Sequence, residues 1–463
     1  MYKDFFDEIT DKKLVSNWYN IRWKHKQNFL TKIQQEIYLS SLRGETSRMI
    51  QFQKIILGSL NSKCFATKII TDSREYNNLS NATKIKIALS LRIHIPQTLY
   101  LYWKGLKINL PYSEFSQIYN QSLQLLILLA LEPQWEAYHE PGVLSFRSQF
   151  SARDAVLGLC QEIRKNTFSY AILGNIHSDI NLEHRKILFR KIFTCKLIFQ
   201  VINSLTTNSS LKHSHRIHSR LSNLIFTILI YGLQYNFLDA NLPFKDFSSI
   251  YYINYQKSFG ILCKTKDMTQ CSKEIFIRFF QVIKLPINQR EYTLSKNCFE
   301  LIFLGFIMKK SSRKLDLIPD QNSKKDLIYN IRKILYKNDF LGRKRALTYL
   351  SLEKAIQKIN PLLINWENYF QICTKNYDFI LMDKIIDNTI YRWQIKKYKK
   401  NRVNSWKQHC TKYIEAKKRI AEGNSILKLL HDQYISRISY IPLIYARSCY
   451  DQDIEYWFLR KKF

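Results

Sequence analysis

Residues 360–370, NPLLINWENYF, and residues 391–419, YRWQIKKYKKNRVNSWKQHCTKYIEAKKR, join two helical patterns to the densest basic run of the chain. Asn360 and Pro361 are typical of a helix N-cap followed by the first helical position. Apolar and aromatic residues then recur at helical spacing, which predicts two amphipathic helices. The first carries Leu362, Leu363, Trp366, Tyr369 and Phe370, and the second carries Phe379, Met382, Ile385, Ile386, Ile390 and Trp393.

The second segment is strongly basic. From Tyr391 to Arg419 there are eleven Lys and Arg residues against the single acid Glu415, and five aromatic residues lie among them. Such a surface suits contact with phosphates combined with stacking on unpaired bases. The alternative is that the aromatic residues form the helix core and the charges form only a solvated face, because apolar stripes at helical spacing usually reflect packing.

The composition of the whole chain narrows the class of protein. With 463 residues, 46% of them hydrophobic and 14% aromatic, the chain can bury large cores and is not a disordered tail. Only 11 Gly and 9 Pro residues favour long regular elements, mostly helices with some strands. The formal net charge of +35 predicts a polyanionic partner, for which RNA, DNA and an anionic membrane are the candidates.

Signals for disulfides, structural zinc and membrane insertion are missing from the sequence. The nine cysteines are scattered and include no C-x-x-C pair, so we expect a reducing compartment. The longest apolar runs, 125–131 and 224–233, fall short of the roughly 18 to 20 residues that a spanning helix needs, and no membrane partner is expected. The start, MYKDFFDEITDKK, resembles neither a signal peptide nor a transit peptide, so a protein that works in an organelle is expected to be made there.

The first helix and the residues after it resemble domain X of group II intron maturases, which follows a reverse-transcriptase region in that family. The resemblance rests on the core residues Asn360, Pro361, Trp366, Tyr369 and Phe370, followed by Asp383 and Arg392-Trp393. It implies a helical segment that binds intron RNA and helps it to fold for splicing. The RNA-binding residues expected from it are Arg392, Trp393, Lys396, Lys397, Lys399, Lys400, Arg402, Trp406, Lys407, Lys412, Lys417 and Lys418.

Other blocks resemble the reverse-transcriptase part of the same family. Residues 13–62 are similar to its N-terminal segment, with a break at Gly44, although a plain helical hairpin is an equal alternative. Phe303-Leu304-Gly305-Phe306 is similar to the turn that closes the palm. Residues 122–156 resemble its ALEP-x-WEA…GFRPGR block, whose template loop has become Ser145–Phe150 here. The retained positions are Leu131, Glu132, Pro133, Trp135, Glu136, Phe146, Arg147, Asp154 and Ala155.

At the positions where the resembling family has the metal-binding acids of a polymerase, this sequence has other residues. Two divalent metals must be held by convergent carboxylates. Asn175 stands where the family has its first aspartate, and Lys257-Ser258 stand where it has the paired aspartates of the YADD hairpin. Lys257 also adds a positive charge where a cation would bind. We therefore expect no catalytic residues, no metal and no cofactor, although metal binding near Asp179 stays open.

Two further groups of residues were weighed as sites. The histidines at 213, 215 and 218 lie among basic residues without Cys or acid neighbours, which argues against a metal site. Residues 430–460 resemble the segment that precedes an HNH nuclease in bacterial relatives, and the sequence after them holds no nuclease ligands, so DNA cleavage is not expected. The matching positions are Ser436-Arg437, Ser448, Tyr450-Asp451, Asp453, Tyr456-Trp457 and Arg460.

The sequence thus predicts an α+β protein with three parts. Residues 1–310 are expected to form degenerate reverse-transcriptase-like fingers and palm, residues 311–420 an all-helical thumb and domain X, and residues 421–463 a C-terminal tail without a nuclease. Within the first part, strand-like FSYAILGNI and YINYQKSFGIL, at residues 168–176 and 252–262, should be neighbouring strands of a small sheet. The KKSSRKLDLIPDQNSKKD stretch at residues 309–326 is polar and marks the boundary before the thumb.

The function expected from the resemblance is that of a non-enzymatic, maturase-like splicing factor. It would assist the folding and excision of group II or group III introns, with intron RNA as partner and nucleus-encoded splicing proteins as further candidates. Loss of the active site with retention of domain X is similar to the maturase-like proteins of euglenoid chloroplast introns, so the plastid is the expected location and the mitochondrion the alternative. Two other functions stay open: an active reverse transcriptase using Asp179 with Asp246 or Asp267, and a general basic RNA-binding protein. Oligomeric state is not indicated.

Overall fold

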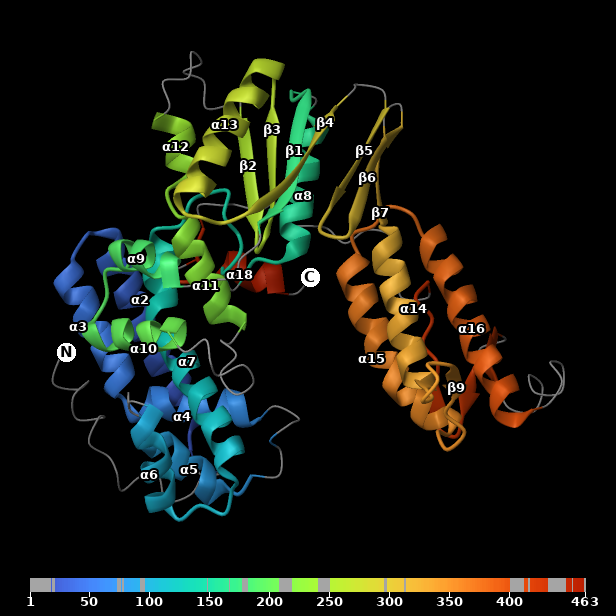
Figure 1. Ribbon diagram of the computed structural model, residues 1–463, viewed down its shortest axis with the longest axis horizontal. Helices are drawn as coiled ribbons and strands as arrows, with labels where there is room; N and C mark the ends of the chain where they lie inside the picture. The colour runs from blue at the N-terminus through green and yellow to red at the C-terminus, as the bar shows by residue number, and fades with distance from the viewer. Residues whose placement is uncertain are drawn as a thin grey trace.

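The computed structural model is a mixed helix and strand structure, as the sequence predicts (Figure 1). It describes residues 18, 21–72, 76, 79–91, 96–147, 149–165, 167–176, 182–207, 219–239, 250–294, 298–311, 314–399, 412–414, 417–431, 447–451 and 453–461. No helix in this part of the chain has a stretch long and apolar enough to cross a membrane.

The N-terminal body is built around α7 (Tyr112–Ala137), whose Leu-rich sequence is buried over most of its length. Helices α2, α3, α4 and α11 pack against it. Gly44, with φ of 71°, separates α2 from α3, as the predicted break requires, because only glycine adopts this conformation without strain. The other helices of the body are α2 (Trp23–Leu42), α3 (Thr46–Gly58), α4 (Leu60–Thr71), α5 (Asn81–Ser90), α6 (Pro96–Leu106), α9 (Leu182–Lys191), α10 (Lys196–Thr207) and α11 (Ser219–Ile230). The next helix, α12 (Leu233–Asp239), packs instead against α13 (Lys266–Val282).

A four-stranded antiparallel sheet follows, with strand order β2-β3-β1-β4. Its strands are β1 (Tyr170–Ile176), β2 (Ile250–Tyr255), β3 (Ser258–Cys263) and β4 (Ile287–Thr293). Alternate residues of β1 face opposite sides, so Ala171 and Leu173 join the core that includes α8 (Ala152–Arg164), whereas Ile172 joins that of α13 (Lys266–Val282). Because β1 pairs with β3, the prediction that the two strand-like stretches are neighbours is confirmed.

A second antiparallel sheet leads to the C-terminal helices. It consists of β5 (Cys298–Phe303), β6 (Phe306–Ser311) and β7 (Lys314–Pro319). The boundary expected between residues 310 and 311 therefore falls inside β6, and the polar stretch around it forms β6, β7 and the start of α14 (Gln321–Leu335). The division of the chain into three domains stays a prediction.

The segment expected to be all helical, 311–420, contains strands as well as helices, which corrects that prediction. Besides α14, α15 (Leu352–Phe370) and α16 (Tyr377–Tyr398), it holds β7 and two hairpins of three-residue strands. These are β8 (Tyr336–Asn338) with β9 (Lys344–Ala346), and β10 (Lys412–Ile414) with β11 (Lys417–Arg419). Gly342 has φ of 73° in the turn between β8 and β9, which favours a reversal of the chain over a continued helix.

The start of α15 corrects a second prediction. The N-cap is Ser351, whose hydroxyl accepts a hydrogen bond from the Lys354 N–H at 3.2 Å, and Pro361 lies inside the helix. Ala355 and Ile356 are buried and carry the apolar stripe back beyond Asn360. This continuous burial and the serine cap start the helix about two and a half turns before the Asn-Pro pair.

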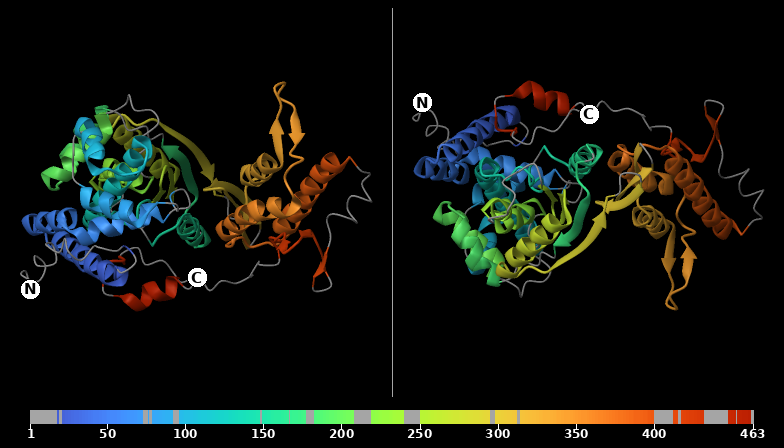
Figure 2. Two further views of the ribbon diagram at one scale, coloured as in Figure 1. Left: turned by 90° about the horizontal axis from the view of Figure 1, so that it is seen from below. Right: turned by 90° about the horizontal axis from the view of Figure 1, so that it is seen from above.

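The end of the chain returns to the N-terminal body. After the short strands β12 (Ala421–Glu422) and β13 (Ser425–Ile426), α18 (Ile454–Lys461) lies beside the N-terminal helices, away from α15 and α16 (Figure 2). Arg460 of α18 forms a 2.7 Å ion pair with Asp154 of α8, and both side chains are buried. At least Arg460, among the tail residues that resemble the segment before a nuclease, therefore packs against the rest of the protein.

Candidate functional site

Asn175 and Ser258, which stand where the resembling family has metal-binding acids, lie together at one end of the sheet. They are directly opposite each other in β1 and β3, and Ser258 Oγ donates a 2.7 Å hydrogen bond to Asn175 Oδ1. Lys257 lies next to them in the exposed turn between β2 and β3, and its carbonyl accepts from the Ile176 N–H at 2.7 Å. The three degenerate positions inferred from sequence therefore share one edge, and the side chains there are an amide, a hydroxyl and an amine.

The turn beside this edge is held by the loop that resembles a template loop. Gln256 has φ of 53°, and its N–H donates to Ser145 Oγ at 2.8 Å. Ser145 Oγ in turn donates to Oδ1 of the buried Asn254 at 2.6 Å, and Asn254 Nδ2 donates to the Ser258 carbonyl at 3.2 Å. This network fixes the turn that presents Lys257 and Ser258, because each buried polar group has a partner.

Of the other candidate acids, Asp267 lies in the described part of the chain and does not reach this edge. Asp267 lies in the first turn of α13, beyond the far end of β3, so about 17 Å of strand separates it from Ser258. Asp179, Asp246 and the histidines at 213, 215 and 218 lie outside the described residues. His184 is buried, with Nε2 3.3 Å from the Lys284 carbonyl. Within the described ranges, no cluster of three or more His, Cys, Asp or Glu side chains is placed to hold a metal.

The block at 131–155 contributes one fully buried ion pair and one that is partly exposed. Arg147 Nε and Glu136 Oε1 are 2.9 Å apart, with side-chain exposures of 0% and 2%. The guanidinium also lies 4.0 Å from the centre of the Phe150 ring and donates to the Arg447 carbonyl of the tail. Glu132 pairs with Arg220 of α11 at 3.0 Å. The contacts of Arg147 therefore anchor the loop that carries Ser145, and the Glu132–Arg220 pair joins α7 to α11.

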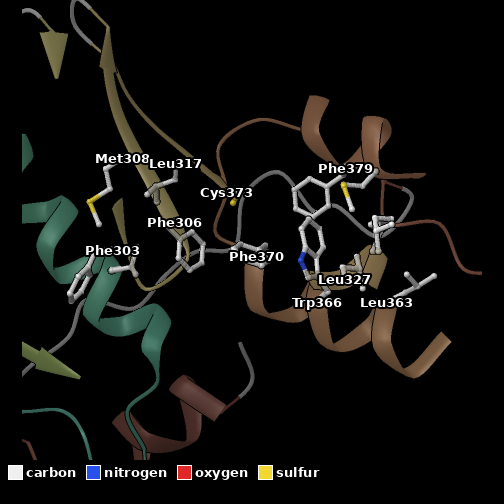
Figure 3. Packing of buried hydrophobic residues seen from close by; sticks show 14 of the residues in the cluster. Phe303, Phe306, Met308, Leu317, Leu327, Leu363, Trp366, Phe370, Cys373 and Phe379 are labelled. Atoms are coloured by element: carbon white, nitrogen blue, oxygen red, sulfur yellow. The ribbon is translucent and has the colours of Figure 1, made fainter. Parts of the chain in front are cut away.

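The aromatic residues of α15 pack on the turn between β5 and β6 (Figure 3). Phe370 lies 4.8 Å from Phe306 and 4.7 Å from Trp366, measured between ring centres. The Tyr369 hydroxyl donates to the Leu304 carbonyl at 2.9 Å, and burial raises the pKa of Tyr369 to about 12, so the hydroxyl stays protonated. Two sequence blocks read separately, 303–306 and 360–370, thus form one contact.

Asn360 and Asp383 hold the segment that follows α16. Asn360 Nδ2 donates to the Ile426 carbonyl at 2.9 Å, and its Oδ1 accepts from the Lys428 N–H at 3.0 Å. The Asp383 carboxylate accepts from the Leu430 and His431 backbone N–H groups at 2.9 and 3.1 Å, and lies 2.7 Å from His431 Nδ1. Both residues therefore have a structural role, because their hydrogen bonds hold residues 426–431 against α15 and α16.

The C-terminal half of α16 presents a basic face. Arg392, Lys396 and Lys399 are exposed, whereas Lys397 donates to the Leu350 carbonyl at 2.6 Å. Trp393 has 0% exposure, so its ring cannot stack on a base while the helix is folded, and its place among the RNA contacts is corrected to the core. Lys400, Arg402, Trp406 and Lys407 lie outside the described residues, and Lys412, Lys417 and Lys418 lie in β10 and β11.

This region matches a known family. Residues 342–414 match the family model described as group II intron, maturase-specific domain. The chain is also 20% identical over 380 residues to Maturase-like protein 1 of Euglena gracilis, which covers 77% of this chain and 78% of that protein. The two matches support a maturase family.

The residues matched by the maturase-specific model include β9, α15, α16 and β10. Two solved structures were also found. Apo telomerase from Candida tropicalis gives a TM-score of 0.32 at 13% identity, covering 65% of this chain and 60% of its own. Telomerase from Candida albicans gives 0.31 at 12% identity, covering 69% and 59%. This chain therefore spans less than two thirds of either telomerase chain.

Proposed function

We propose that this protein is a maturase-type splicing factor that binds intron RNA and stabilises its folded form, while the RNA supplies the chemistry. The observation that carries the proposal is the maturase-specific match at residues 342–414, which coincides with α15, α16 and their exposed basic face. Arg392, Lys396 and Lys399 project from one half of α16, where they can neutralise phosphates. The net charge of +35 adds long-range attraction for the same partner.

The proposal assigns reverse-transcriptase-like parts to the fold. The helices around α7 correspond to fingers, the β2-β3-β1-β4 sheet to a palm, and α14 with the maturase-specific domain to a thumb and domain X. Support comes from the Tyr369–Leu304 and Phe370–Phe306 contacts, which attach α15 to the turn that the sequence identified as closing the palm.

Polymerase activity is proposed to be lost. Two-metal phosphoryl transfer needs acids that bridge the ions. Asn175 and Ser258 instead satisfy each other by a hydrogen bond, and the adjacent Lys257 would repel a cation. In this proposal the edge is a structural remnant that keeps the turn between β2 and β3 in place.

The RNA is proposed to be an organellar group II or group III intron, and the plastid is the proposed compartment, with the mitochondrion as alternative. The support is the similarity to Maturase-like protein 1 of Euglena gracilis. Nucleus-encoded proteins are proposed to assist in splicing.

The test is binding and splicing of the intron that contains the reading frame, or of the introns of the same organelle genome. The protein should bind such a transcript more tightly than a size-matched structured RNA at equal salt, and should increase the spliced fraction at low Mg2+. Equal affinity for both RNAs without any effect on splicing would point instead to a general RNA-binding protein.

A further inference from the structure

The hairpin formed by β8 and β9 is a built element that projects from the C-terminal helices. Figure 2 shows it, in orange, as an arm that stands clear of α14, α15 and α16. Its strands pair Tyr336 with Ala346, Lys337 with Arg345 and Asn338 with Lys344. The arm starts directly at the end of α14, and the Leu347 N–H donates to the Leu335 carbonyl at 3.0 Å, which closes its base.

Asp339 organises the turn at the tip. Its Oδ1 accepts from the Leu341 and Arg343 N–H groups at 3.0 and 2.8 Å, and its Oδ2 accepts from Arg345 Nε at 3.0 Å. The Gly342 N–H donates to the Asp339 carbonyl at 2.9 Å. The turn is therefore held in shape by its own polar groups and does not need the side chains of Phe340 and Leu341.

Those two side chains point away from the protein. Phe340 is fully exposed and Leu341 is 74% exposed, and Tyr349, just after β9, is 81% exposed. Exposing a phenylalanine on a preformed turn forgoes roughly 1.5 to 3 kcal/mol of burial. An exposed apolar side chain on a rigid turn is well placed to be buried by a binding partner.

The net positive charge of the arm favours an anionic partner. Lys337, Arg343, Lys344 and Arg345 are all exposed, and Asp339, the single acid between 336 and 350, is consumed by the turn. Lys337 lies directly opposite Arg345 in the hairpin, and Asp339 already forms a 3.0 Å ion pair with Arg345. The charges of Lys337, Arg343 and Lys344 therefore remain for a bound polyanion.

The base of the arm continues the basic face of α16. Lys396 Nζ lies 5.4 Å from the centre of the Tyr336 ring, and Lys397 reaches the Leu350 carbonyl just beyond the arm. Arg332 of α14 and Arg392 of α16 are both close enough to act electrostatically on the Tyr336 hydroxyl. An RNA lying along α16 can therefore reach the arm without crossing an acidic surface among these residues.

We propose that the β8–β9 arm is a second RNA contact of this protein, in which Phe340 stacks on an unpaired base while Arg343 and Lys344 bind the flanking phosphates. The inference rests on the proposed function and deepens it, because it assigns base stacking to the arm and not to Trp393. An aromatic ring beside cations is the arrangement by which proteins bind single-stranded RNA. Two apolar tip residues are too few for stable attachment to a membrane, which needs a longer apolar face.

The test uses the full-length protein and a synthetic RNA stem with a single-stranded overhang containing 2-aminopurine, whose fluorescence is quenched by stacking. Phe340→Ala should weaken binding about 5- to 150-fold, the equivalent of 1 to 3 kcal/mol for one stacked base, with an unchanged salt slope. It should also abolish the quenching, and Phe340→Trp should restore both. Arg343→Gln with Lys344→Gln should lower the log-log salt slope by about 1.4 to 1.8 while quenching persists at low salt.

Matched controls lie on the N-terminal body and on α13. Lys32→Gln with Lys54→Gln removes two exposed charges, and Val282→Ala shortens an apolar side chain that is 70% exposed; neither should alter the quenching. Wild-type affinity and quenching in the Phe340→Ala variant, with binding still weakened by changes on α16, would overturn the arm and leave the proposed function standing. Failure of the wild-type protein to bind any RNA would overturn both. Loss of binding to phosphatidylglycerol vesicles by Phe340→Ala, with RNA binding intact, would make the arm a membrane contact and refute the proposal.

Discussion

Ser258 Oγ donates a 2.7 Å hydrogen bond to Asn175 Oδ1 across directly opposed positions of β3 and β1. In the proposed palm assignment, this pair occupies the positions at which a polymerase would gather carboxylates around two metals. An amide and a hydroxyl that satisfy each other offer weak ligands to a divalent cation, which prefers carboxylate oxygens. In the proposed assignment, this edge therefore holds an amide–hydroxyl pair in place of metal-binding carboxylates.

We therefore predict that the purified protein does not extend a primer on an RNA template with either Mg2+ or Mn2+. The reason is the lack of acids at Asn175, Lys257 and Ser258, which neither ion can replace. Primer extension with radiolabelled nucleotide measures this. Extension that disappears in an Asp179→Ala variant would contradict the prediction and revive the reverse-transcriptase alternative.

The Glu136–Arg147 ion pair predicts a large loss of stability on single substitution. Glu136→Gln leaves the Arg147 charge buried without its anion, which costs about 3 to 5 kcal/mol in the free energy of unfolding. The matched change at an exposed pair, Glu291→Gln opposite Lys273, should cost less than about 1 kcal/mol. Denaturant unfolding of both variants provides the comparison, and equal losses would show that the buried pair is not an anchor.

Replacing Gly305, in the turn between β5 and β6, is expected to lower the stability of the protein. It has φ of 78°, and an added Cβ would lie 2.9 Å from Ser323 Oγ and 3.7 Å from Phe370. Gly305→Ala should therefore destabilise the protein by about 1 to 2 kcal/mol. Gly58→Ala is the control, because nothing lies within 4 Å of a Cβ there. Thermal unfolding should separate the two variants, with a lower midpoint for the first alone.

The carboxyl group of Asp387, in α16, is expected to make the stability of the fold depend on pH. Burial, followed by the charge of Asp383, raises the pKa of Asp387 to about 6, against attraction from Arg419 and His431. Between about pH 4 and pH 6, the folded state thus keeps a proton that the unfolded state has released. The stability that this protonated carboxyl contributes is fully present below about pH 4 and is lost as the pH rises through 6. Asp387→Asn should be more stable than wild type at pH 7.5, by at most roughly 3 kcal/mol, and not at pH 3.5.

Unfolding midpoints at the two pH values measure this effect. The exposed Asp326→Asn variant serves as the control and should show the same difference from wild type at both. An Asp387→Asn variant with no advantage at pH 7.5 would show that the carboxylate is stabilised as an anion in the fold.

Sequence reasoning succeeded where a local pattern determines the structure. The β1 and β3 stretches are short apolar runs, and Gly44 breaks a helical period, so their elements could be predicted before any contact was known. The resemblance assigned Asn175, Lys257 and Ser258 to positions of one site, and the strand register places Asn175 opposite Ser258.

Other features depend on contacts that sequence spacing does not contain. An Asn-Pro pair usually starts a helix, but the Ser351 cap and the burial of Ala355 and Ile356 determine the start of α15. A helical stripe does not tell whether Trp393 faces the core or a ligand. The β8–β9 arm was missed because three-residue strands are too short to show a period, although Asp339 and Gly342 mark its turn.

The central claim is that the exposed basic face of α16 binds intron RNA. The most direct test is the salt dependence of binding for the Arg392→Gln, Lys396→Gln, Lys399→Gln triple variant. Its log-log salt slope should be lower than that of wild type by about 2 to 2.7, since each neutralised phosphate contributes about 0.7 to 0.9, and splicing should decline with it. A triple variant at the exposed Lys32, Lys54 and Lys104 should keep the wild-type slope. An unchanged slope and full splicing in the α16 variant would contradict the claim that this helix is the RNA-binding element.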